Sequence, residues 1–467
     1  MTGAINPSDG PSSSDSDTET SESVAPAAVE SPRVTAADIP ERRLRVGVLG
    51  FSVLGVLATA SVLMVLFAVP LGAHYWGMFD NFLDLDVYRH GGSVVVQGLP
   101  LYDGPVLQGM MFTYTPFAAL LFTVWAVLSF KQAIVVWTGL NIAALFAVIV
   151  LCWKYLGYRL DVKAYAVSAL ATTIFLFMEP IRTTLWLGQI NIFLLLLIVW
   201  DLGRDEKSRL RGIGAGIAAG VKLTPAFFWA YLFITRQWRA LVTAVVTFAA
   251  TVAIGFVVIY NDAYKYWTGT LVDSERVGPT DAPSNQSVSG LIAQLTHTPE
   301  PSKALVLVFS ALAVCLGLGA AWIAHRHGQK LLGLTMTGLT ATTVSPFSWG
   351  HHWVWFVPLV VLTAHYAMVS KKRLAWVAPF VFLLPALNWS HTFWGPSFVP
   401  GTDRFVGMGL FMFVPPDYLR IPAVGVYLWV FILAAASTLI LFGMKKWAVP
   451  TAHSTSRPPT ALTPQGR

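Results

Sequence analysis

The chain has 467 residues, of which 55% are hydrophobic and only 12% charged, and its mean hydropathy is +0.61, whereas soluble domains carry about 25% charged residues. The net charge of +7 is spread over short loops rather than gathered in one module, so it indicates membrane topology and excludes nucleic acid as a partner. Long apolar blocks favour an all-α polytopic integral membrane protein with about 10 to 12 transmembrane helices over a barrel of alternating strands.

Both ends of the chain have compositions that cannot bury enough apolar surface to fold. Residues 1–44 include the acidic run SSSDSDTETSES, and residues 446–467 are rich in Ser, Thr and Pro. No cleavable signal peptide is recognisable before the first apolar run, so that run is expected to remain as an anchor. We therefore expect disordered cytoplasmic tails on either side of one membrane domain at residues 45–445.

The basic residues Arg42, Arg43 and Arg45 precede the first apolar run, residues 46–72. The positive-inside rule then places both termini in the cytoplasm and the loop at residues 74–112 outside. Later basic loops continue this alternation and put residues 260–302, 346–352 and 389–420 outside. The spans expected there are 240–259, 303–324, 331–345, 353–369, 374–388 and 421–443.

The apolar blocks in the first half of the chain do not alternate consistently. If the blocks at 114–130, 132–153, 164–178 and 188–201 all crossed, the topology would conflict with the basic loop from Arg204 to Arg211, so we expect one block to dip without crossing. The segments on either side of Lys222 are too short for two spans, so they predict either one long kinked helix or a broken pair that returns to the same face. The two cysteines, Cys152 and Cys315, lie in apolar blocks and are expected to be buried small hydrophobes.

The first outer loop carries the sequence DLDVYR, which contains Asp84, Asp86, Tyr88 and Arg89. Carboxylates near a bilayer are costly, so they indicate function. The alternation in residues 84–97 predicts a short amphipathic helix on the outer surface. The structural alternative is that Asp84 only caps this helix.

A second group of polar residues interrupts apolar surroundings in the middle of the chain. Gln189 and Asn191 are suited to bind a polyhydroxylated ligand, or else to join helices by hydrogen bonds. Arg182 is a candidate to receive a phosphate. Lys222, in GVKLTP, must extend to the interface, pair with a carboxylate or bind an anion.

A third group is the segment SWGHHWVW with Trp349, His351 and His352. Adjacent histidines on a helix point about 100° apart, so they do not form a metal-binding pair, and we expect neither a metal nor another cofactor. One histidine is suited to donate a hydrogen bond or carry a proton, and Trp349 either supports a sugar or anchors the chain at the interface. Asn285 and Gln286, in NQSVSG, are polar enough to bind hydroxyls.

These groups together indicate glycosyl transfer from a lipid-phosphate sugar. Cationic side chains stabilise the phosphate leaving group, and a carboxylate deprotonates the acceptor hydroxyl. No Gly-rich phosphate loop or Rossmann-like half is visible. A lipid-linked sugar flippase or transporter is the alternative class, although the internal repeats that would favour it are not visible.

The ordered motifs DLDVYR, FTYTP, LGQIN, GVKLTP, NQSVSGL and SWGHHWVW resemble glycosyltransferase family 87, of the C-type superfamily, over residues 46–445. The resemblance implies the C-type glycosyltransferase fold and an alpha-(1→2)-mannosyltransferase of mycobacterial type. Such an enzyme uses polyprenyl-phosphate mannose and works on the extracytoplasmic side of the cytoplasmic (plasma) membrane, among the membrane lipids. The implied acceptor is a glycolipid: a phosphatidylinositol mannoside, lipomannan or lipoarabinomannan.

The family pattern Asp-x-x-Val-Tyr falls on Asp84, Val87 and Tyr88, so the resemblance implies that Asp84 is the base, with Asp86 as the fallback. Either His351 or His352 matches the family histidine. An arabinofuranosyl or glucosyl donor in place of mannose stays open. The expected contacts to the donor phosphate and sugar are Tyr88, Arg89, Arg182, Gln189, Asn191, Lys222, Asn285, Gln286 and Trp349.

Overall fold

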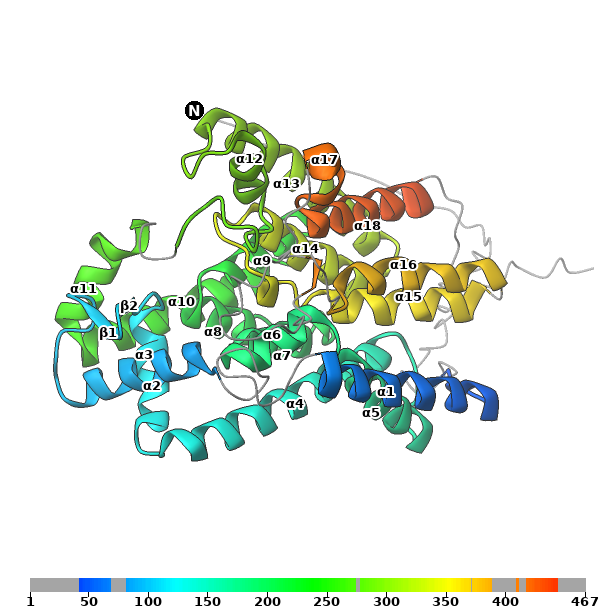
Figure 1. The fold of residues 1–467 in the computed structure, drawn as a ribbon, viewed down its shortest axis with the longest axis horizontal. Coiled ribbons are helices and arrows are strands. Elements are labelled where there is room, and N and C mark those ends of the chain that lie inside the picture. Colours follow the sequence, from blue (N-terminus) through cyan, green and yellow to red (C-terminus); the bar gives the residue numbers. More distant parts are fainter. Residues whose placement is uncertain are drawn as a thin grey trace, which may run out of the picture. The chain divides into compact units, whose positions relative to one another are not determined.

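The computed structural model describes residues 42–68, 81–273, 278–370, 372–388, 409–410 and 417–443 (Figure 1). The expected tails lie outside these ranges except for residues 42–44. Helices dominate the described residues, and the strands there form one antiparallel hairpin, β1 (Pro105–Leu107) with β2 (Met110–Met111). The expectation of an all-α membrane protein is therefore confirmed.

Five helices in the described residues are long and apolar enough to cross a membrane, or six if one bent pair forms a single span. A helix of 18 residues is about 27 Å long, close to the thickness of the hydrocarbon core. The chain is therefore a multi-pass membrane protein. These five helices are α1 (Val48–Ala68), α4 (Phe130–Tyr155), α10 (Trp238–Val258), α13 (Lys303–Arg326) and α18 (Val426–Gly443).

Shorter apolar helices of 10–17 residues lie at several of the other apolar segments. They do not reach span length individually, so the 10 to 12 crossings stay a prediction. They are α3 (Pro116–Ala126), α5 (Val162–Phe175), η2 (Thr224–Phe227) with α9 (Phe228–Ile234), α15 (Phe356–Ser370), and η6 (Arg373–Trp376) with α16 (Val377–Leu383) and η7 (Leu384–Ala386).

Two breaks interrupt the described apolar helices, and the second lies where the sequence predicts one. α6 (Glu179–Leu187) and α7 (Asn191–Gly203) are bent by 119° relative to each other, and Gly188 between them has a positive φ of 69° that suits glycine. α8 (Ile213–Val221) ends at Lys222, whose backbone is extended. The break expected at Lys222 is thus the α8–η2 break, whereas the expectation that one apolar block dips without crossing stays a prediction.

The bend and the break lie close together in the fold. α7 packs against α4, α8 and α14, while α2 packs against α3, and Figure 1 shows α6, α7 and α8 side by side with α2 and α3 next to them. The remaining described helices are α2 (Leu83–Val96), α11 (Tyr260–Thr268), η3 (Thr270–Val272), α12 (Val288–Thr296), α14 (Lys330–Val344), η5 (Gly350–His352), η10 (Asp417–Leu419) and α17 (Arg420–Ala423).

The two cysteines differ in environment. Cys152 is buried, as expected, whereas Cys315 is exposed and the expectation of burial is wrong for it. Cys315 lies on α13, a candidate span of which 22% is buried within the protein, so an apolar side chain there would face lipid in a membrane rather than the protein interior. Hydrophobic composition alone does not distinguish these two apolar surroundings.

Candidate active site

Asp84 lies in the first turn of the expected amphipathic helix, α2. The residue before α2, Phe82, forms no side-chain cap, and the amide of Leu83 donates to Oδ1 of Asn81 at 2.9 Å. The Asp84 carboxylate instead accepts a hydrogen bond from the side chain of Gln189 and interacts electrostatically with Lys222. Helix capping alone therefore does not account for Asp84.

Asp86 points away from this contact because residues two apart on a helix are about 200° apart around its axis. The Arg89 guanidinium donates to Oδ1 of Asp86 at 3.0 Å, and Nδ1 of His90 lies 3.3 Å from the same oxygen. Arg89 also donates to the carbonyl of Leu128 at 2.9 Å. Asp86 and Arg89 are thus paired with each other and are not joined to the Asp84 cluster.

The bend between α6 and α7 brings two expected amides next to α2. Tyr88 and Tyr114 place their hydroxyls 3.1 and 3.0 Å from Oε1 of Gln189. Asn191 donates through Nδ2 to the carbonyl of His351 at 2.9 Å. These contacts join α2, the bend and the histidine segment into one polar network.

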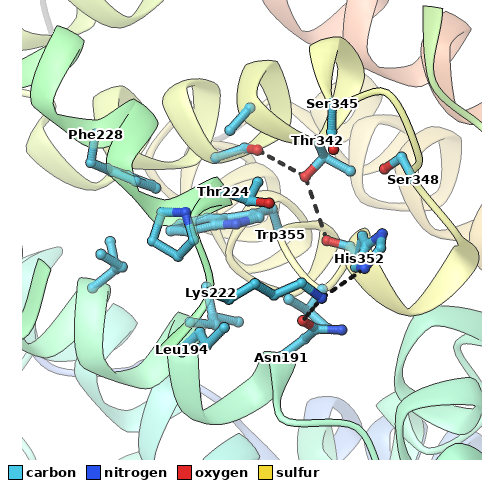
Figure 2. A pocket seen from close by; sticks show the side chains of 16 residues that line it. Asn191, Leu194, Lys222, Thr224, Phe228, Thr342, Ser345, Ser348, His352 and Trp355 are labelled. Atoms are coloured by element: carbon cyan, nitrogen blue, oxygen red, sulfur yellow. Dashed lines mark hydrogen bonds between the residues drawn. The ribbon is translucent and has the colours of Figure 1, made fainter. Parts of the chain in front are cut away.

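Lys222 and His352 meet at the break after α8. Nζ of Lys222 lies 2.9 Å from Nε2 of His352 and donates to Oδ1 of Asn191 at 3.3 Å (Figure 2). The backbone N–H of Trp349 donates to Nδ1 of His352 at 3.0 Å. Since this amide can only donate, a neutral His352 carries its proton on Nε2.

The charge of His352 follows from its surroundings. Burial, followed by the charges of Lys222 and His351, lowers the pKa of His352 well below its ordinary value, so the ring is neutral. Its Nε2–H and the ammonium group of Lys222 are then two donors facing each other. An anionic oxygen that lies beside both nitrogens, within hydrogen-bond distance of each, would be stabilised by both donors.

A cavity of about 50 Å³ adjoins this pair of donors, which is room for a few water molecules. Figure 2 shows Lys222 and Asn191 at one side of it and Phe228 at another. The ring of Trp355 lies 5.2 Å from that of Phe228, centroid to centroid, and is the tryptophan that lines the cavity, rather than Trp349. Its lining is polar at Asn191, Lys222, Thr224, Thr342, Ser345, Ser348 and His352, and mainly apolar at Leu194, Leu195, Ile198, Pro225, Phe228, Gly338, Ala341, Val354 and Trp355.

Asn285 and Gln286 brace the chain next to the histidines. Asn285 accepts from the backbone N–H of Ser348 at 3.0 Å, and the backbone N–H of Gln286 donates to the carbonyl of Ser348 at 2.9 Å. The side-chain amide of Asn285 also donates to the carbonyl of Pro346 at 3.3 Å. Both residues are buried, so the structure places them behind the histidine segment rather than at the cavity.

Arg182 and its neighbour Glu179 lie on the buried helix α6. The Arg182 guanidinium lies 4.9 Å from the ring centroid of Trp186 and does not line the cavity. Glu179 accepts from the hydroxyls of Thr183 and Tyr427, each at 2.6 Å, which ties α6 to α18. Arg182 thus belongs to the support of the site rather than to its cavity.

Tyr114 and Glu179 have clear roles in this arrangement but are absent from the expected site. Tyr114 lies in the FTYTP motif and contacts Gln189, whereas a Cβ on Gly350 would lie 2.1 Å from Oε1 of Glu179. Glu179 therefore packs directly against the histidine segment. The polar segments in which Tyr114 and Glu179 lie are recognisable in the sequence. Those segments do not reveal which distant residues the two side chains contact.

The Asp84 carboxyl has an unusual titration for an aspartate. Burial raises its pKa from 3.8 to about 6, although the Gln189 hydrogen bond and the Lys222 charge lower it. A carboxyl with this pKa is largely ionised at neutral pH and is better matched to accept a proton there than an ordinary aspartate.

Gly188→Ala is expected to disturb the site indirectly, by changing the backbone that supports it. A Cβ at this position would lie 2.6 Å from Cβ of Leu85, beside Asp84, and the positive φ alone costs about 1–3 kcal/mol for a non-glycine residue. We expect a lower melting temperature and lower activity. Gly139→Ala is the matched control, because nothing lies within 4 Å of its new Cβ; equal stability and activity of the two variants would contradict the role given to Gly188.

Comparison with known proteins gives consistent results. The model of glycosyltransferase family 87 matches residues 112–346, a segment that contains Gln189, Asn191 and Lys222 and lies between Asp84 and the two histidines. The polyprenol-phosphate-mannose-dependent alpha-(1-2)-phosphatidylinositol mannoside mannosyltransferase of Mycobacterium tuberculosis is 33% identical over 64% of this chain and 75% of its own length.

The chain is also similar to relatives whose names give another acceptor or another sugar. The corresponding phosphatidylinositol pentamannoside mannosyltransferase of Mycobacterium tuberculosis is 34% identical over 69% of this chain and 73% of its own length. An alpha-(1->3)-arabinofuranosyltransferase of the same species is 25% identical over 58% of this chain and 63% of its own length. No solved structure matches the chain.

Proposed function

The chain belongs to glycosyltransferase family 87, and on this premise we propose that it transfers mannose from polyprenyl-phosphate mannose to a phosphatidylinositol mannoside, with Asp84 as the general base. The observation that carries the proposal is the polar network that joins Asp84 to Lys222 and His352 through Gln189 and Asn191. The candidate base, Asp84, and the side chains that would stabilise an anionic leaving group, Lys222 and His352, thus lie at two ends of one site.

Lys222 and His352 supply the site for the donor phosphate. Two donors face each other there, and an oxygen of the lipid phosphate would accept from both. The negative charge that develops on the leaving phosphate as the glycosidic bond breaks is stabilised by these groups. The apolar side of the cavity, with Phe228 and Trp355, suits the first isoprenoid units next to the phosphate.

Asp84 rather than Asp86 suits the role of base. Asp84 is held within the network and has a pKa of about 6, whereas Asp86 is paired with Arg89 and His90. The base takes the proton of the acceptor hydroxyl as its oxygen attacks the anomeric carbon, and the phosphate leaves from the other side of the sugar. His352 rather than His351 contacts Lys222, so His352 is the proposed phosphate contact.

The position of the reaction relative to the membrane follows from the basic residues before α1. In the plasma membrane, Arg42, Arg43 and Arg45 would keep the amino terminus on the cytoplasmic side. α2 and Asp84 are then on the extracytoplasmic side. This orientation is part of the proposal, as are the cytoplasmic carboxyl terminus and the lipomannan or lipoarabinomannan acceptors that remain alternatives to a phosphatidylinositol mannoside.

The purified protein, reconstituted in lipid, is expected to form a mannosylated product from polyprenyl-phosphate mannose and a phosphatidylinositol mannoside extract. The corresponding arabinofuranosyl and glucosyl donors are expected to be turned over at least about 10-fold more slowly, because sugar hydroxyls that find no partner lose hydrogen bonds. Mass spectrometry of the lipid product measures transfer with each donor.

Two outcomes of this assay would contradict the proposal. Faster transfer from the arabinofuranosyl or glucosyl donor would replace mannose with that sugar. Movement of labelled donor between leaflets without formation of any new glycosidic bond would instead indicate a flippase. Vesicles without the protein are the control for spontaneous movement of the lipid.

A further inference from the structure

We propose that Gln189 is a positioning residue that holds the Asp84 carboxylate in place for proton abstraction, and that Tyr88 and Tyr114 lock its amide in the orientation this task requires. The inference rests on the proposed function, because the task exists only if Asp84 is the base. It gives Gln189 a role other than the expected contact with the donor sugar.

The tyrosine pair is fixed by packing before it meets Gln189. Tyr88 is fully buried and stacks on Phe122, with ring centroids 4.3 Å apart, and it meets Tyr114 edge-on at 5.0 Å. The two hydroxyls lie 2.7 Å apart, and each is within 3.1 Å of Oε1 of Gln189. Rings held in this way present their hydroxyls at a fixed point, to which the amide must adapt.

The chemistry of an amide allows only one orientation between these partners. Its oxygen accepts and its NH₂ group donates, whereas an ionised carboxylate only accepts. Gln189 therefore turns its oxygen to the tyrosine hydroxyls and its NH₂ group to Asp84. The reverse orientation would oppose the amide oxygen to the Asp84 carboxylate, where neither group can donate.

Water cannot repair the reverse orientation. Gln189 is only 4% exposed, and a buried polar group without its partner loses the hydrogen bond with no compensation from solvent. The tyrosines thus transmit their fixed position through Gln189 to Asp84. With one carboxylate oxygen held by the amide, the other is directed to the acceptor hydroxyl.

The hydrogen bond also changes the acidity of the base. A donor to the ionised form of a carboxyl stabilises that form, and the Gln189 contact lowers the pKa of Asp84 against the larger effect of burial. Loss of the donor therefore raises that pKa. Since only the ionised base is active, the acid limb of the rate profile must move to higher pH.

Gln189→Leu tests the proposal through kcat and donor KM measured as functions of pH on the reconstituted protein. We expect kcat to fall about 10-fold or more and the acid limb to rise by about one pH unit, with little change in donor KM. Asn141→Leu is the matched control, because Asn141 is also a fully buried amide but donates within its own helix, to the carbonyl of Trp137 at 3.1 Å. The control is expected to leave the acid limb unchanged.

Tyr88→Phe and Tyr114→Phe test the lock while keeping both rings. Each single variant leaves one hydroxyl that donates to Oε1. We therefore expect kcat to fall less than about 3-fold, because one neutral hydrogen bond makes only a small net contribution. The double variant removes both hydroxyls and leaves Oε1 only the long contact with Nδ2 of Asn191 at 3.5 Å, so it is expected to reproduce the shift of the acid limb seen in Gln189→Leu. A synergy of this kind is not expected from lost packing.

Three results would overturn the inference. One is a wild-type kcat and acid limb in Gln189→Leu, and another is a raised donor KM with an unmoved limb, which would indicate that Gln189 contacts the donor. The third is a wild-type dependence of kcat on pH in the folded double tyrosine variant. This variant tests the inference even if Gln189→Leu does not fold. Undiminished activity of Asp84→Asn would refute the proposed base instead, so the two failures are distinguishable.

Discussion

Asp84→Asn is expected to lower kcat for mannosyl transfer by about 10²–10⁴-fold, the range over which a positioned general base contributes. Asparagine keeps the shape of the side chain but cannot accept the proton of the acceptor hydroxyl. In the unchanged protein, the rate should fall as the pH drops through about 6, because burial raises the pKa of Asp84 to that value and only the ionised form is a base. Initial rates of lipid product formation between pH 4.5 and pH 8, a range chosen to bracket about 6, measure both effects.

Asp86→Asn is the matched control for this prediction. It makes the same change two residues away, at a carboxylate paired with Arg89 and His90 at the half-buried surface of α2. Such an ion pair contributes about 0–1 kcal/mol, so we expect activity within about 3-fold of the unchanged protein. A severe loss in Asp86→Asn with full activity in Asp84→Asn would reverse the assignment of the base.

Lys222→Met is expected to reduce kcat by about 10²–10³-fold, as removal of one preorganised group that stabilises transition-state charge commonly does. Methionine retains much of the apolar length of lysine but leaves the developing phosphate charge facing His352 alone. Because the ammonium also binds the ground-state phosphate, donor KM should rise as well. Single-turnover rates and donor binding to the reconstituted protein separate the two effects.

Lys265→Met provides the control for the loss of a lysine. Lys265 lies on α11 and pairs with Asp103, with both side chains about half exposed, so the substitution removes a surface charge outside the network. We expect unchanged kcat and donor KM. Equal losses in the Lys222 and Lys265 variants would show a general effect of charge and contradict a specific phosphate site at Lys222.

Several features of the fold were predictable because they depend on local sequence. The amphipathic helix α2 follows from the alternation after Asp84, and the break at Lys222 follows from short apolar segments around Lys-Leu-Thr-Pro. In each case, the hydrophobic pattern or the loop charge on which the prediction depends lies within about 20 residues of sequence.

The exposure of Cys315 and the roles of Asn285 and Gln286 were not predictable in this way. An apolar helix face toward lipid and one toward protein have the same composition, so Cys315 carries no local sign of its exposure. A polar NQS segment has the same appearance whether its amides meet a ligand or the backbone near Ser348. The distinction depends on which distant segment packs against it.

The sequence by itself determined that this is a helical multi-pass membrane protein and, through ordered motifs, that it resembles glycosyltransferase family 87. Those properties follow from hydrophobic length, charge and local pattern, which neighbouring residues carry. Only the tertiary structure separated Asp84 from Asp86, joined His352 to Lys222 and directed Gln189 to Asp84. Gln189 lies 101 residues from Tyr88 and Lys222 lies 130 from His352, and contacts over such separations depend on how the helices pack rather than on local sequence.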